Sequence, residues 1–87
     1  MRLIAFHQNA FEHFSEWAKT DKKLFERINR LIIESAANPF VGIGKPEPMR
    51  GDRRGYWSRR ITDEHRLVYK VTDEYITIAS CKFHYTE

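Results

Sequence analysis

Glu47, Arg66 and His84 together carry the side chains that cleavage of an RNA strand without a metal ion would need. RNA supplies its own nucleophile, the 2′-hydroxyl beside each phosphodiester. An enzyme must add a base that takes the hydroxyl proton, a cation that stabilises the pentacovalent phosphorus, and an acid that protonates the departing 5′ oxygen. Glu, Arg and His can fill these roles in that order, and Tyr85 could stack on a base or orient the phosphate.

Each of these residues also has a purely structural interpretation, because no short motif links them. Glu47 could form an ion pair within its loop, Arg66 could be an exposed strand arginine, and His84 could be a terminal residue without a partner. Nearby cations would also make Glu47 a weaker base. The residue types and their spacing leave both interpretations open.

Other chemistries find less support in the sequence. The four histidines lack the spacing of metal ligands, and Cys81 is the only cysteine. The chain also lacks the nucleophile elbow of a serine hydrolase. We therefore expect no metal and no cofactor, and we expect Cys81 to lie in the core.

Positive charge is concentrated in the middle of the chain. The 87 residues have a formal net charge of +3, and residues 45–70 carry eight Lys or Arg against four Asp or Glu. Most of the eight are arginines, which match the geometry of phosphate, and Tyr56 and Trp57 could stack on bases. The segment is typical of an RNA-binding surface, but also of a solvated basic face.

The spacing of apolar residues predicts the elements that hold these side chains. We expect a first strand over residues 2–6, a helix from about residue 8 to residue 19, and a second helix that starts at Thr20 or Asp21 and ends at Asn38. All three prolines and all four glycines fall within residues 39–55, which is typical of a long ordered loop. Two of these prolines flank Glu47 and restrict its backbone.

Three further strands are predicted over residues 56–62, 65–71 and 75–84, connected as an antiparallel meander. In the middle strand Leu67 and its alternate neighbours should face the helices, so that Arg66 faces the other side. The order predicts one α+β domain over residues 1–87, with two helices on one face of a four-stranded, mostly antiparallel sheet. No apolar run is long enough to span a membrane, and the start lacks the length of a signal peptide, so we expect a cytoplasmic protein.

Several stretches resemble the YoeB family of bacterial toxins, within the RelE/ParE-like superfamily. They are Asn38-Pro39-Phe40, Gly44-Lys45-Pro46-Glu47-Pro48, Trp57-Ser58-Arg59-Arg60-Ile61-Thr62, Glu64-His65-Arg66-Leu67-Val68-Tyr69 and His84-Tyr85. The resemblance extends over residues 2–85 and implies the RelE-like microbial ribonuclease fold. It also implies the toxin of a type II toxin–antitoxin pair, an mRNA interferase that cuts mRNA in the ribosomal A site and so inhibits translation.

The same resemblance implies a role for each site residue. Glu47 would be the general base, Arg66 would stabilise the transition state, His84 would be the general acid, and Tyr85 would position the substrate, without a metal. Four basic residues are implied to contact mRNA or ribosomal RNA: Lys45, Arg50, Arg59 and Arg60.

The implied partners are a YefM- or Phd-like antitoxin, mRNA, the 70S ribosome, operator DNA bound through the antitoxin, and a second copy of the chain. Two alternatives remain open. One is a ParE-like toxin that binds DNA gyrase, although such toxins lack the Glu, Arg and His set. The other is a module that binds RNA or the ribosome without cutting, through the basic segment and its aromatic residues.

Overall fold

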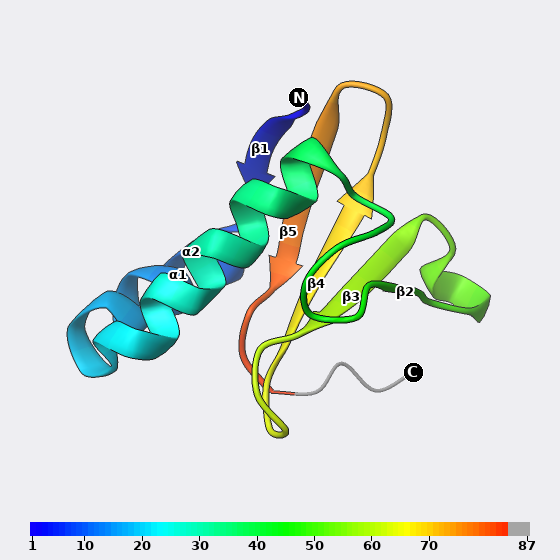
Figure 1. Cartoon of the computed structure of the whole chain (residues 1–87). Coiled ribbons are helices and arrows are strands. Elements are labelled where there is room, and N and C mark those ends of the chain that lie inside the picture. Colours follow the sequence, from blue (N-terminus) through cyan, green and yellow to red (C-terminus); the bar gives the residue numbers. More distant parts are fainter. Residues whose placement is uncertain (84–87) are drawn as a thin grey trace.

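Two helices lie against one side of a five-stranded sheet in the computed structural model, which describes residues 1–83 (Figure 1). The elements, in chain order, are β1 (Leu3–Phe6), α1 (Gln8–Thr20), α2 (Lys22–Ala37), β2 (Glu47–Pro48), the short 3₁₀ helix η1 (Gly51–Arg53), β3 (Tyr56–Arg60), β4 (Arg66–Val71) and β5 (Tyr75–Ser80). The predicted α+β class and the two helices are confirmed. The predicted strand count is one too low, because residues 47–48 pair with β3 as a short additional strand.

The boundary between the two helices is set by Asp21. Its side chain accepts a hydrogen bond from the backbone N–H of Leu24 at 3.1 Å, which satisfies one of the free donors at the start of α2. The apolar stripe of α2 is buried at Ile28, Leu31 and Ile32. α2 ends just before Pro39, as the sequence predicts. None of the helices within residues 1–83 is long and apolar enough to span a membrane.

The sheet has the order β1-β5-β4-β3-β2, with β1 parallel to β5 and every other pair antiparallel. The two helices pack on its β1, β5 and β4 part. On that side Leu67 and Tyr69 of β4 are completely buried, together with Ile76 and Ile78 of β5. The predicted orientation of the middle strand is therefore confirmed.

A bulge in β5 differs from the sequence prediction of one regular strand over residues 75–84. Val68 pairs with Ser80, whereas the next residue, Tyr69, pairs with Ile78, so Ala79 is the extra residue on β5. The extra residue reverses the alternation, and Cys81 therefore joins Ile78 in the core cluster. The strand β5 ends at Ser80, so residues 81–83, which were predicted to continue it, lie outside the strand.

Candidate active site

Two of the expected catalytic residues share the face of the sheet that the helices leave uncovered. The register pairs Glu47 on β2 with Ser58 on β3, and Ser58 with Val68 on β4. Arg66 precedes Val68 by two residues on the same strand, so its side chain leaves the sheet on the same side as that of Glu47. Leu67 points the opposite way, into the core.

Glu47 is exposed on a short edge strand whose backbone is fixed against β3. The carbonyl oxygen of Gly44 accepts from the N–H of Arg60 at 2.6 Å, and the N–H of Met49 donates to the carbonyl oxygen of Tyr56 at 2.9 Å. Residues 44–49 thus run alongside β3 for their whole length. The carboxylate stands in solvent on a backbone that two prolines and these hydrogen bonds restrict.

The guanidinium of Arg66 is held by the turn that precedes its own strand. Nη1 donates to the carbonyl oxygens of Thr62, His65 and Asp63 at 2.6, 3.2 and 3.4 Å. Carbonyl oxygens carry no net charge, so they orient the guanidinium without neutralising it. The side chain is half-buried and remains partly open to solvent.

His84 and Tyr85 lie outside the described residues, so their positions stay predictions. The structure does place the residue before them, because the carbonyl oxygen of Phe83 accepts from the backbone N–H of Arg66 at 3.2 Å. The chain therefore passes Arg66 immediately before it reaches the expected acid.

Three of the four basic residues expected to contact RNA are exposed: Lys45, Arg50 and Arg60. Arg60 pairs in register with Arg66 and so belongs to the same face as Glu47. Its guanidinium forms an exposed ion pair with Asp63, at 3.5 Å. Within residues 1–83 no group of three His, Cys, Asp or Glu side chains is placed to hold a metal ion.

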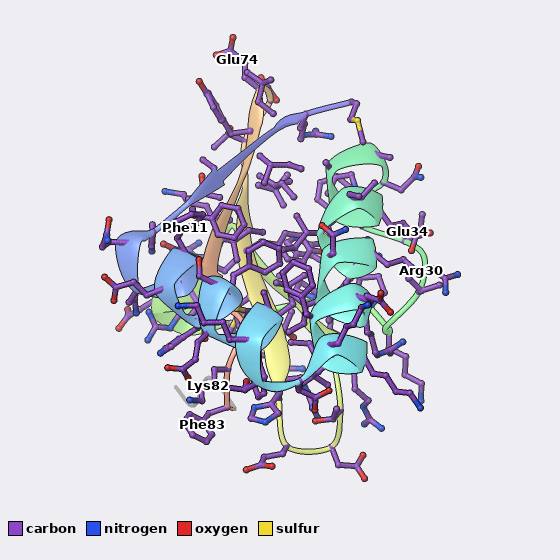
Figure 2. The ribbon with its side chains drawn as sticks, turned by 90° about the vertical axis from the view of Figure 1, so that its left-hand side faces the viewer. Phe11, Arg30, Glu34, Glu74, Lys82 and Phe83 are labelled. Carbon is purple, nitrogen blue, oxygen red and sulfur yellow. The ribbon has the colours of Figure 1, made fainter. Side chains whose placement is uncertain are left out.

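The expectation that Arg59 contacts RNA is wrong, because its side chain is completely buried on the core side of the sheet. The guanidinium binds Glu34 of α2 at 3.3 Å and the hydroxyl of Tyr69 at 3.0 Å. It also donates to three carbonyl oxygens of the loop after α2, those of Asn38, Val41 and Ile43. Figure 2 shows Glu34 projecting from α2 on the side of this loop. Arg59 thus holds the loop that leads to Glu47.

Comparison with known proteins gives a consistent family. Residues 6–85 match the model of the "YoeB-like toxin of bacterial type II toxin-antitoxin system". The chain is 52% identical over 82 residues to Toxin YoeB of Streptomyces coelicolor, covering 94% of this chain and 98% of that protein. It is 47% identical over 85 residues to Toxin YoeB of Escherichia coli K12, covering 98% and 100%.

Solved structures agree with this result. A YoeB/ParE toxin from Agrobacterium tumefaciens superposes with a TM-score of 0.91 at 42% identity, over 98% of this chain and 100% of that chain. A YoeB dimer from Staphylococcus aureus gives a TM-score of 0.88 at 47% identity, over 97% and 98%. A YoeB–YefM complex from the same organism gives 0.86 at 47% identity, over 98% and 100%.

Proposed function

Because the chain belongs to the family of YoeB-like toxins of bacterial type II toxin–antitoxin systems, we propose that it is an mRNA interferase that cuts mRNA in the ribosomal A site. The observation that carries the proposal is the projection of Glu47 and Arg66 from the face of the sheet opposite the helices, which also carries Arg60. A carboxylate and a cation on such a face are the base and the electrostatic stabiliser that RNA cleavage requires.

The proposed reaction is a transfer of the phosphoryl group within the RNA. Glu47 takes the proton from the 2′-hydroxyl, and the 2′ oxygen attacks phosphorus while the bond to the 5′ oxygen breaks. Arg66 stabilises the charge on the phosphorane, and His84 gives its proton to the departing 5′ oxygen. The products are a 2′,3′-cyclic phosphate and a free 5′-hydroxyl, and no metal takes part. Tyr85 positions the scissile phosphate.

The exposure of the site gives a physical reason for dependence on the ribosome. Glu47 lies on an edge strand and is exposed, so the described part of the protein does little to immobilise a flexible RNA strand around it. The ribosome holds the A-site codon in a defined geometry, which removes much of the entropic cost of orienting the substrate. Lys45, Arg50 and Arg60 then contact the phosphates of mRNA or ribosomal RNA.

The partners follow from the same family. We propose that a YefM-like antitoxin covers the basic face of the sheet, since YoeB–YefM complexes exist among the structural relatives. Operator DNA is bound through that antitoxin, and a second copy of the chain associates as in the S. aureus YoeB dimer. The protein acts in the cytoplasm, where its ribosomal substrate is found.

Primer extension in a reconstituted translation system tests the proposal. Wild-type protein should produce cuts at codons when ribosomes are present and far fewer on naked mRNA. Glu47→Gln, which keeps the size of the side chain, should cut about 10²- to 10⁴-fold more slowly, and His84→Gln should be similarly impaired. Each variant should melt at the wild-type temperature, which separates lost chemistry from lost folding.

Two results would contradict the proposal. Blocked translation with intact mRNA would indicate a protein that binds the ribosome without cutting. Unimpaired translation combined with inhibition of DNA gyrase would indicate a ParE-like activity instead.

A further inference from the structure

His65 lies buried immediately before β4 and forms a hydrogen bond with Phe83, 18 residues further along the chain. Its side chain accepts a hydrogen bond at Nδ1 from the backbone N–H of Phe83, at 2.8 Å. The imidazole ring also contacts the rings of Phe83 and Trp17, with centroids 5.5 and 5.0 Å apart. The residue is 8% exposed, so water competes weakly for this hydrogen bond.

The peptide groups on both sides of Phe83 are therefore held by two consecutive residues, His65 just before β4 and Arg66 at its start. His65 accepts from its N–H, and the N–H of Arg66 donates to its carbonyl oxygen at 3.2 Å. Phe83 has φ +60°, in the left-handed region that L side chains rarely adopt, so the surrounding bonds maintain an unfavourable backbone conformation. The hydrogen bonds therefore fix the backbone conformation of Phe83 itself.

Helix α1 holds the two preceding residues. The indole N–H of Trp17 donates to the carbonyl oxygen of Cys81 at 3.1 Å, and Lys82 forms an ion pair with Glu16 at 3.2 Å. Figure 2 shows Lys82 and Phe83 side by side below α1. Residues 81–83 are thus attached to α1 on one side and to β4 on the other.

We propose that His65 is a positioning residue for the reaction: by holding Phe83 next to Arg66, it restrains the chain at the residue that directly precedes His84 in the sequence. The proposal rests on the proposed function, because it assigns to His84 the role of the acid. Because His84 follows Phe83 directly in the sequence, restraining Phe83 would lower the conformational entropy that must be lost when the proposed acid reaches the phosphate.

The hydrogen bond from the N–H of Phe83 determines which ring nitrogen of His65 carries the proton. Nδ1 can accept only when it carries no proton, so the proton of the neutral ring is on Nε2. Nε2 lies 3.6 Å from Oε1 of Glu64, and this carboxylate favours a proton on that nitrogen. The charge of Glu64 thus favours the tautomer of His65 in which Nδ1 is free to accept from the peptide N–H of Phe83.

A pair of matched variants tests this role. His65→Asn keeps an acceptor, since the Asn side-chain oxygen can take the place of Nδ1, whereas His65→Leu fills a similar volume without one. Amide hydrogen exchange of Phe83, measured by NMR, reports whether the hydrogen bond to His65 restrains this residue. Single-turnover cleavage of mRNA on programmed ribosomes reports the effect of that restraint on the reaction.

In His65→Leu the Phe83 amide should exchange roughly tenfold faster, as expected for the loss of one hydrogen bond, while amides of β4 stay protected. The maximal cleavage rate should fall by a similar factor at an unchanged half-saturating toxin concentration. His65→Asn should restore both quantities, and the ring ¹⁵N signals of the wild-type protein should be those of the neutral Nε2–H tautomer.

If the exchange rate of the Phe83 amide is unchanged in His65→Leu, His65 does not restrain Phe83, and the proposal is wrong whatever the cleavage rate. Equal loss of turnover in the Asn and Leu variants would show that His65 acts by packing alone. If the wild-type protein does not cleave mRNA, the proposed function is wrong, and so is the role of the His65–Phe83 hydrogen bond in proton transfer. The exchange data would still decide whether the hydrogen bond restrains Phe83.

Discussion

Arg59 and Arg60 are adjacent on β3, yet one is completely buried and the other is exposed. Successive residues of a strand face opposite sides of the sheet, which sends one guanidinium into the core and the other to the uncovered face. A buried guanidinium is tolerated only when it is paired and its N–H groups are bonded. Glu34, Tyr69 and the carbonyls of the loop after α2 meet that requirement for Arg59.

Substitution by methionine should separate the structural role of Arg59 from the RNA-binding role proposed for Arg60. Arg59→Met removes the partner of Glu34 and of several carbonyl oxygens, so it should destabilise the fold by about 3 kcal/mol, measured by urea denaturation. Arg60→Met should change the free energy of unfolding by less than about 0.5 kcal/mol and instead weaken association with ribosomes, with a smaller dependence on salt. Equal stability of both variants would contradict the assignment.

The contrast between these arginines also shows which part of the site the sequence could predict. The face of β4 was predictable because Leu67, Tyr69 and Val71 alternate with Arg66, Val68 and Lys70, two of which are charged. In β3, both faces carry aromatic or basic side chains, so no face is marked as buried. A buried arginine is favourable there only because the loop after α2 brings unpaired carbonyl groups against it, and that loop is positioned by tertiary contacts.

At the scale of the elements, the loop before β2 decides where the expected base is placed. Gly44 has φ +79°, and a Cβ added there would lie 2.9 Å from Cδ2 of Leu31 and 3.1 Å from the carbonyl oxygen of Arg60. Both contacts are closer than real Cβ atoms tolerate well, and one of them is to backbone. Residues 44–49 can therefore follow β3 only when residue 44 has no side chain.

Gly44→Ala should accordingly reduce both stability and cleavage. Gly55→Ala is the matched control, because Gly55 also has a positive φ, of +89°, but has open space where the Cβ would be. Both variants should lose about 1 kcal/mol from the backbone conformation, and Gly44→Ala should lose clearly more because of the clash. The comparison uses the thermal unfolding of the two variants and the rate at which each cleaves mRNA on ribosomes. Similar losses of stability and of cleavage rate in both would show that the packing around Gly44 does not matter.

The elements that the sequence predicts least well are those that depend on a partner strand. The two helices were predictable from their apolar periodicity and from the cap at Asp21. The two-residue strand β2 is too short to have a pattern of its own, and it exists only because β3 offers a free edge. The bulge at Ala79 likewise depends on the register with β4, which no local pattern of β5 specifies.

The whole molecule is divided into a core side and a site side by its sheet. The helices cover one face with apolar residues, and the other face presents Glu47, Arg60 and Arg66. This division was predictable in outline, since the alternation in β4 assigns each residue to a face. Cys81 lies on the core side, where its thiol is within 3.6 Å of the carbonyl oxygen of Ala10.

Burial raises the pKa of the Cys81 thiol to about 11, an effect that the charge of Lys82 partly opposes. Only the thiolate reacts rapidly with thiol reagents, so labelling of the folded protein at neutral pH should be very slow. Unfolding in urea should make it fast, and raising the pH towards 11 should increase the rate in the folded state. Fast labelling at neutral pH without denaturant would contradict the burial of Cys81.

Cleavage of an mRNA with a single 2′-deoxynucleotide at the A-site cleavage position tests the central claim most directly. If the face that carries Glu47 and Arg66 uses the 2′-hydroxyl as nucleophile, programmed ribosomes should yield a 2′,3′-cyclic phosphate from ordinary mRNA and no product from the deoxy substrate. Cleavage of the deoxy substrate would mean that water or another nucleophile attacks phosphorus, and it would contradict the mechanism assigned to these residues.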